Sequence, residues 1–140
     1  MSHELAGAYV LDSFALLAFL SGEVGMLQVQ VVLRGRAKVV LSIINLGEVL
    51  YITERQRGLP VAQHVLAVVE QLPIELVEAT RSRVLAAAHI KASFRLSYAD
   101  AFVIAAAQEF GATVLTGDPE FEAPAAAGVI HVEWLAAAPS

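Results

Sequence analysis

The chain has 140 residues, of which 57% are hydrophobic and only 16% are charged. About 100–200 residues is typical of one domain, and this apolar content excludes intrinsic disorder, which requires low hydrophobicity and high charge. The net charge is −5 and there is no cysteine, which excludes a generally basic nucleic-acid-binding protein, a disulfide scaffold, a zinc finger and a thiol nucleophile. We expect a single domain over residues 1–140, with a frayed tail from about residue 136.

The apolar stretches are too short for a membrane protein. The longest runs, Phe14–Leu20 and Ala101–Ala107, fall well short of the roughly 18 residues that a spanning helix needs. The apolar stretch near the N-terminus contains Asp12, and Glu4 rather than Lys or Arg precedes it, unlike a signal peptide. We therefore expect a cytoplasmic protein without a membrane segment.

Two patterns alternate along the chain. Short runs of apolar and β-branched residues are typical of strands, and apolar residues at helical spacing, bounded by glycine or proline, are typical of helices. The predicted strands are Ala8–Leu11, Lys38–Ile43, Ile74–Val77, Thr113–Thr116 and Val129–Val132. The predicted helices are Phe14–Leu20, Glu23–Gly35, Asn45–Arg57, Pro60–Leu72, Thr80–Phe94 and Ser97–Phe110, with a short helix or loop over Glu120–Ala127.

This alternation predicts an α/β fold. The predicted strands are short and mostly apolar, as expected when both faces are covered, which is typical of a parallel sheet with helices on each side. We therefore expect a three-layer α/β/α sandwich around a short parallel sheet of about five strands. In such sheets, functional residues lie at the carboxyl ends of the strands.

Four acidic residues fall at that edge of the predicted sheet. Asp12 ends the first strand, and Asp118 follows the fourth. Glu48 lies early in the helix after the second strand, and Asp100 lies in the first turn of the helix that leads into the fourth. The three aspartates are the only ones in the chain, whereas Glu48 is one of eleven glutamates.

Each acid also has a simpler interpretation. Asp12 is placed to cap the next helix, Asp118-Pro119-Glu120 is a typical helix start, and Ser97-Tyr-Ala-Asp100 is close to a capping box. Glu48 fits a solvated helix face. Four such residues need not converge, however, and these four lie where one site would form.

Converging carboxylates have specific chemical consequences. They repel one another and raise each other's pKa unless a cation joins them. A set of oxygen ligands suits Mg²⁺ or Mn²⁺. Such an ion activates water and stabilises charge on a phosphate, so the acidic set favours phosphodiester hydrolysis.

Four sequence blocks contain these acids. They are Asp12-Ser13, Asn45-Leu-Gly-Glu48-Val49, Leu96-Ser-Tyr-Ala-Asp100-Ala101 and Leu115-Thr116-Gly-Asp118-Pro-Glu120-Phe121. In order and spacing across nearly the whole chain, the blocks resemble the motifs of PIN-domain ribonucleases. The greatest resemblance is to the VapC toxins of bacterial and archaeal toxin–antitoxin pairs.

The resemblance implies a metal-dependent RNA endonuclease that acts as a toxin, with a sheet order of 3-2-1-4-5. It also implies a homodimer and an antitoxin whose tail fills a groove near the acids. Many relatives carry a second aspartate two residues after the fourth acid, whereas Glu120 stands there in this chain, and we expect it to be auxiliary. The implied catalytic and metal-binding residues are Asp12, Glu48, Asp100 and Asp118, with Ser13, Asn45 and Thr116 as polar supports.

Two arginines are candidate contacts to RNA phosphates. Arg55 lies seven residues after Glu48, on the same helical face, and Arg57 follows it. The simpler interpretation of both is solvated charge at the end of a helix.

The excess of apolar residues predicts apolar surface. The candidates for a dimer seam or a groove for a partner helix are the second predicted helix, with Met26, Leu27 and Val31, and the segment Ile43–Ile52. Ordinary core is the alternative for both.

Three other functions stay open at this point. The chain could be a PIN nuclease with a housekeeping role in RNA maturation, or a non-catalytic binding module with the same fold. The third is a phosphorylation receiver, which needs an acid pair after the first strand and a lysine after the last. This chain has only Asp12 at the first place, and its two lysines are Lys38 and Lys91, so a receiver is the least favoured.

Overall fold

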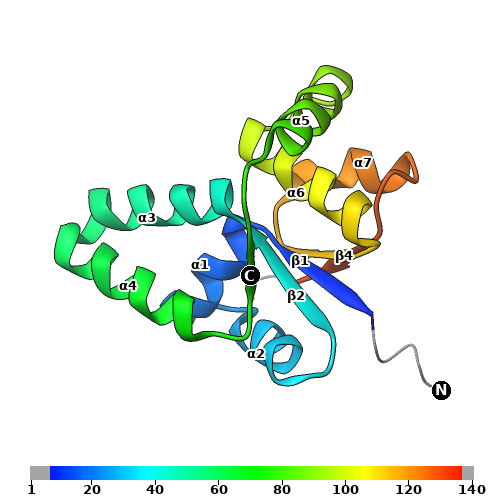
Figure 1. Cartoon of the computed structure of the whole chain (residues 1–140). Coiled ribbons are helices and arrows are strands. Elements are labelled where there is room, and N and C mark those ends of the chain that lie inside the picture. The colour runs from blue at the N-terminus through cyan, green and yellow to red at the C-terminus, as the bar shows by residue number, and fades with distance from the viewer. Residues whose placement is uncertain (1–6, 137–140) are drawn as a thin grey trace.

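The computed structural model describes residues 7–136, so most of the predicted tail lies outside the described residues. The strands of the described part form one parallel sheet in the order β3-β2-β1-β4-β5, which confirms the predicted order (Figure 1). Phosphorylation receivers have the order 2-1-3-4-5, so this sheet argues against that alternative. The strands are β1 (Ala8–Leu11), β2 (Lys38–Ser42), β3 (Glu75–Val77), β4 (Thr113–Thr116) and β5 (Val132–Trp134).

Helices cover both faces of the sheet, which confirms the predicted three-layer sandwich (Figure 1). One face is covered by α1 (Ser13–Ser21), α2 (Met26–Arg34), α3 (Ile43–Arg57) and α4 (Leu59–Gln71). The other is covered by α5 (Arg81–Ser93), α6 (Tyr98–Phe110) and α7 (Glu122–Ala126), with the 3-10 turn η2 (Pro119–Phe121) before α7.

The core has two halves because successive side chains of a strand point to opposite faces. Val10 and Val114 pack in the half beneath α5 and α6. Leu11 and Leu115, the next residues of the same strands, pack against the layer of α1 to α4. All four are fully buried, which is why adjacent positions in these strands are both apolar.

The sequence predicts the last strand over Val129–Val132, and this is wrong, because β5 spans Val132–Trp134. Val129 and Ile130 belong to the core half beneath α6. They follow a turn in which Gly128 has a φ of 75°. β5 is a partly exposed edge strand, so the apolar run that suggested a strand marks the entry to it instead.

The second helix begins at Met26 rather than at Glu23. Gly25, directly before it, has a φ of 99°. This positive φ lies outside the helical region and is readily adopted only by glycine. The other helices and strands lie within about two residues of their predicted bounds, which is the usual uncertainty of helix ends.

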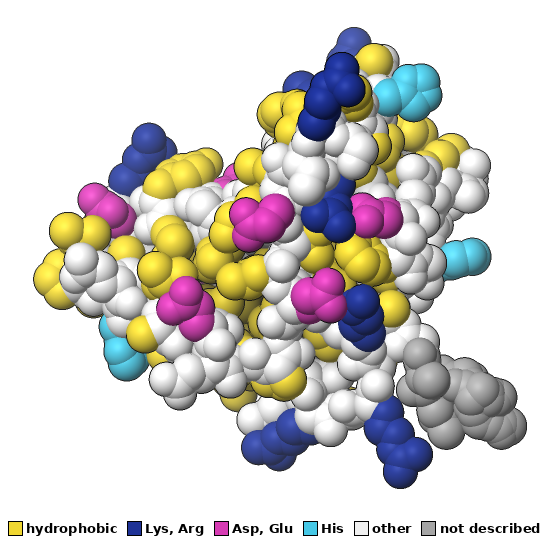
Figure 2. All heavy atoms as spheres, in the orientation of Figure 1, with side chains coloured by type: hydrophobic (Ala, Val, Ile, Leu, Met, Phe, Trp, Pro, Cys, Tyr) yellow, Lys and Arg dark blue, Asp and Glu magenta, His cyan; other side chains and the backbone are white. Residues whose placement is uncertain are grey.

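Part of the predicted apolar surface is present. On α2, Leu27 is 65% exposed and Val31 is 70% exposed. On α3, by contrast, Leu46 and Val49 are buried in the core, whereas Tyr51 is exposed. Figure 2 shows one face of the molecule, on which hydrophobic side chains lie between scattered charged ones.

Within residues 7–136, no single helix has both the length and the apolarity to cross a membrane. Among these residues, only the pair α1 and α2 together has that length and apolarity, and the two helices meet at an angle of 101°.

Candidate metal centre

Three aspartates meet at the carboxyl edge of the sheet. Asp12 directly follows β1, Asp118 follows β4, and Asp100 lies in the first turn of α6. A carboxylate oxygen of each lies within 4.8 Å of the others. The pairing of Leu11 with Leu115 in the β1–β4 register brings the ends of these two strands to the same level. We call Asp12, Asp100 and Asp118 the three-aspartate cluster.

Local hydrogen bonds orient Asp12. Its Oδ1 accepts the N–H of Ala15 at 2.7 Å, which caps α1. Its Oδ2 accepts the hydroxyl of Thr116, and the Thr116 oxygen in turn accepts the N–H of Asp118 at 2.9 Å. Asp12 therefore both caps α1 and belongs to the cluster, since the capping hydrogen bond fixes its carboxylate there.

Asp100 reaches the cluster because other residues satisfy the start of α6. Ser97 Oγ accepts the N–H of Asp100 at 3.0 Å, as an N-cap. In a capping box the acid three residues on would accept the N–H of the cap residue. Here Glu120 Oε1 accepts it instead, at 3.3 Å. The Asp100 carboxyl group hydrogen-bonds to Glu120 and stays among the aspartates.

The three-aspartate cluster lines a cavity of about 350 Å³. Glu48 lines the same cavity from α3 but does not belong to the cluster. Glu120 and Ser13 also line it. Among the described residues, none of those lining this cavity is basic.

Asn45 links three helices behind this cavity and is fully buried. Its Nδ2 donates to Ser13 Oγ at 3.3 Å and to the carbonyl of Ala99 at 3.2 Å. The Ser13 hydroxyl donates to the Asn45 carbonyl at 3.3 Å. Asn45 and Ser13 thus tie the start of α3 to the starts of α1 and α6, the helices that carry two of the aspartates.

Burial and mutual repulsion raise the pKa of two of the aspartates. Loss of hydration raises the pKa of Asp12 to about 7, and Asp118 adds to the rise, against hydrogen bonds from Thr116 and Ala15. Burial is the main cause that raises the pKa of Asp100 to about 8. Its hydrogen bond with Glu120 and the charges of Asp118 and Asp12 add to the rise. The same hydrogen bond lowers the pKa of Glu120.

A divalent cation fits this arrangement. Two oxygens on opposite sides of Mg²⁺ are about 4.2 Å apart, which is comparable with the spacing of the ligand atoms in the cluster. The donors are carboxylate oxygens, which suit Mg²⁺ or Mn²⁺ rather than zinc. A cation would also favour the ionised form of Asp12 and Asp100, which burial disfavours.

The structure does not bring the two predicted RNA-binding arginines to this cavity. Arg55 and Arg57 are exposed near the end of α3, and the Arg55 guanidinium lies 4.9 Å from the centre of the Tyr51 ring. Their role in binding RNA stays a prediction. Sequence reasoning missed Ser97 and Phe14, which also line the cavity. The spacing of Ser97, three residues before Asp100, could have indicated that Ser97 lies near the site.

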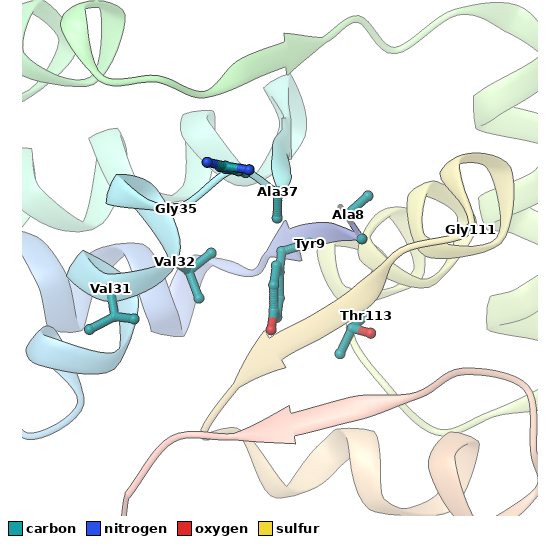
Figure 3. Close-up of a pocket in the computed structure, with 10 residues that line it drawn as sticks. Ala8, Tyr9, Val31, Val32, Gly35, Ala37, Gly111 and Thr113 are labelled. Carbon is teal, nitrogen blue, oxygen red and sulfur yellow. The ribbon is translucent and has the colours of Figure 1, made fainter. Parts of the chain in front are cut away.

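A larger cavity, of about 650 Å³, lies at the opposite edge of the sheet. Figure 3 shows Tyr9, Val32 and Thr113 around it. Its described lining contains Arg36 and no acidic residue. The acidic side chains thus line the smaller of the two cavities.

The family model of the PIN domain matches residues 9–127. No curated protein matches the sequence closely enough to count as a relative.

Several solved structures share the fold. A chain of VapBC2 from Rickettsia felis, bound to a DNA fragment from its promoter, is 14% identical with a TM-score of 0.72, covering 92% of this chain and 99% of that chain. VapC20 of Mycobacterium tuberculosis, a sarcin-ricin loop cleaving toxin, is 18% identical with a TM-score of 0.68, covering 83% and 94%. DNA-bound VapBC from Salmonella typhimurium is 20% identical with a TM-score of 0.66, covering 91% and 97%. The family match spans most of the chain, and this chain therefore belongs to the PIN domain family.

Proposed function

We propose that this chain is a metal-dependent endoribonuclease that acts as the toxin of a toxin–antitoxin pair, with residues 1–140 working as one domain in the cytoplasm. The observation that carries the proposal is the three-aspartate cluster, which is rich in oxygen ligands and lines a cavity whose described lining has no basic residue. Membership of the PIN family supports the same class of reaction.

The side chains of the cavity have distinct roles in this proposal. Asp12, Asp100 and Asp118 would hold Mg²⁺ or Mn²⁺, which when bound supplies a water of lowered pKa and stabilises charge on the phosphate. Thr116 orients Asp12 through its hydroxyl group. Glu48 faces the cavity from α3 and would orient the attacking water, and Glu120 is auxiliary because it holds Asp100 and the start of α6.

The toxin role draws support from the shared fold with chains of solved VapBC complexes. We propose an antitoxin partner and a homodimer, for which the exposed Leu27 and Val31 of α2 offer apolar surface. Expression of the protein should arrest growth, and the product of a neighbouring gene should relieve the arrest. A housekeeping nuclease would cleave RNA without arresting growth.

The first experiment is RNA cleavage by the purified protein in Mg²⁺ or Mn²⁺, compared with EDTA. Asp12→Asn is the test variant. Glu70→Gln is the control, since it also removes one negative charge but from an exposed position on α4 that does not line the cavity. We expect cleavage to disappear in EDTA and in Asp12→Asn and to persist in Glu70→Gln. A protein that binds no divalent metal by calorimetry would overturn the proposal and favour a non-catalytic binding module.

A further inference from the structure

A second hollow adjoins the acidic cavity. It measures about 690 Å³, and its lining is mainly apolar, with Phe14, Val24 and Leu135 among the residues. Phe14 lines both this hollow and the cavity of the three-aspartate cluster. Gly117, which lines the hollow, directly precedes Asp118. A ligand in the hollow would therefore lie next to a phosphate held at the aspartates.

Phe14 is an exposed aromatic residue that its surroundings hold in place. It is 46% exposed, although Ser13 and Ala15 on either side are buried. One edge of its ring meets Gly117 so closely that a Cβ there would lie 2.5 Å from Cε1 and 2.9 Å from Cζ. Only glycine permits this approach. The contact fixes the ring by its edge and leaves other ring surface open to solvent.

The charge of the hollow matches a base better than a phosphate. Glu23 is the one charged residue among the described residues that line it. A carboxylate repels phosphates and accepts hydrogen bonds from amino groups such as N4 of cytosine. The flat apolar ring of Phe14 suits the face of a nucleobase, since bases stack on aromatic side chains in single-stranded nucleic acids.

We propose that this hollow, which we call the base pocket, holds one unpaired nucleobase of the RNA substrate beside the scissile phosphate. The base stacks on Phe14, and Glu23 accepts a hydrogen bond from its amino group. The inference rests on the nuclease function proposed above and adds Phe14, Gly117 and Glu23 as residues that determine which RNA is bound.

The test measures binding rather than cleavage. Short oligomers of each of the four ribonucleotides are compared with an abasic ribose-phosphate chain of the same length, in Ca²⁺, which takes oxygen ligands like those of the cluster. The wild-type protein should bind at least one base-containing oligomer about 10-fold more tightly than the abasic chain, within the range measured for one base stack. The ratio of the two affinities cancels contributions from phosphate contacts.

Two variants should weaken stacking of the base on Phe14 in different ways. Phe14→Leu keeps an apolar side chain but removes the flat ring, and Gly117→Ala pushes the ring out of place. Each should bring the affinity ratio close to 1. The double variant should behave like Phe14→Leu alone, because the shorter leucine removes the clash and the two effects share one contact. Leu85→Ala, at an exposed apolar position on α5 that does not line the base pocket, should leave the ratio unchanged.

Glu23→Gln tests the polar part of the site and should change the ranking of the four bases. An unchanged ratio in both Phe14→Leu and Gly117→Ala, with melting temperatures close to that of the wild type, would overturn the proposal and leave the hollow for an apolar side chain of a protein partner. A wild-type protein that does not distinguish the abasic chain would overturn it as well. If the wild type prefers bases but cleaves no RNA in Mn²⁺, the nuclease function fails, and only the binding of an unpaired base on Phe14 is supported.

Discussion

The two edges of the sheet hold acidic residues in opposite circumstances. At the carboxyl edge, Asp12 and Asp100 are buried, and no basic residue lines their cavity in the described part of the chain. At the amino ends of β2 and β3, Glu75 pairs with Lys38 at 3.2 Å. Nearby, Glu109 accepts two hydrogen bonds from the Arg83 guanidinium, at 2.9 and 3.0 Å. We call these two pairs the amino-edge ion pairs.

The pKa values of the acids at the two edges are shifted in opposite directions. The hydrogen bond from Arg83 lowers the pKa of Glu109, whereas burial raises the pKa of Asp12 and Asp100. Figure 2 shows, on one face, Asp and Glu side chains that lie beside Lys or Arg. An exposed pair of opposite charges is already satisfied and contributes little. Buried like charges destabilise the fold until a cation joins them. Burial without a partner, rather than the number of acids, therefore distinguishes the candidate site.

The largest expected effect is on cleavage. Asp118→Asn should lower metal-dependent RNA cleavage by more than about 100-fold, because losing a ligand costs more than losing a residue that supports one. Glu109→Gln, which removes one carboxylate from the amino-edge ion pairs, should leave cleavage unchanged. Single-turnover rates in Mn²⁺ measure both. Equal losses in the two variants would remove the distinction between the edges.

The second effect is on metal affinity as a function of pH. Ions compete with the protons on Asp12 and Asp100, whose pKa values are about 7 and about 8. The affinity for Mn²⁺ should therefore rise by up to about 10-fold per pH unit for each proton displaced, between about pH 6 and about pH 8. Calorimetry at several pH values measures this, and an affinity that does not change over this range would contradict it.

The same protons affect stability in the absence of metal. Unfolded aspartates release their protons near a pKa of about 3.9, whereas folded Asp12 and Asp100 keep them up to about 7 and about 8. The folded state then binds more protons, so the free energy of unfolding should fall as the pH rises from about 4 to about 8. Denaturant unfolding in EDTA measures the slope, and Asp12→Asn should reduce it.

A smaller loss of activity should follow from Thr116→Val, which keeps the shape of a fully buried side chain but removes the hydroxyl between Asp12 and Asp118. We expect about 10-fold less cleavage, near the lower end for a partner of a metal ligand. The pH profile should also shift to higher pH, because the hydroxyl lowers the pKa of Asp12. Thr116→Ser should restore both, and a loss of activity without a pH shift would indicate a packing role instead.

The smallest effect concerns the amino-edge ion pairs themselves. Glu109→Gln should change the melting temperature by less than about 4 °C, and added salt should reduce the difference from the wild type. The pair contributes when Glu109 is ionised, so its effect should disappear as the pH falls through the lowered pKa of that carboxyl. Thermal melts at low and high salt measure this. A large, salt-independent loss would show that this edge holds more than a surface pair.

Local sequence determined the fold class and much of the position of the acids. Strands such as β1 and β4 have adjacent apolar residues because helices cover both of their faces, and this pattern can be recognised from the strand's own residues. Asp12 and Asp118 were placed correctly at strand ends, since a capping residue is defined by the few residues that follow it. The strand order came from the resemblance of the four motif blocks and not from the strands themselves.

The sequence patterns predicted the wrong structure where a residue's contacts come from a distant part of the chain. The apolar pair Val129 and Ile130 indicated a strand but packs beneath α6, because hydrophobicity reports burial and not pairing. The Ser97–Asp100 spacing suggested a capping box, but the reciprocal acceptor is Glu120, from the turn after β4.

Only the tertiary structure decided which of the acids meet and what lies beside them. Asp12, Asp100 and Asp118 form the cluster while Glu48 lines the cavity from α3, although the resemblance implied a metal-binding role for all four. The contact between Phe14 and Gly117 likewise depends on how α1 lies against the end of β4. The physical reason is that caps and periodicity are set by bonds within a few residues. Burial, pKa values and the shape of a cavity are set by the packing of elements that the sheet brings together.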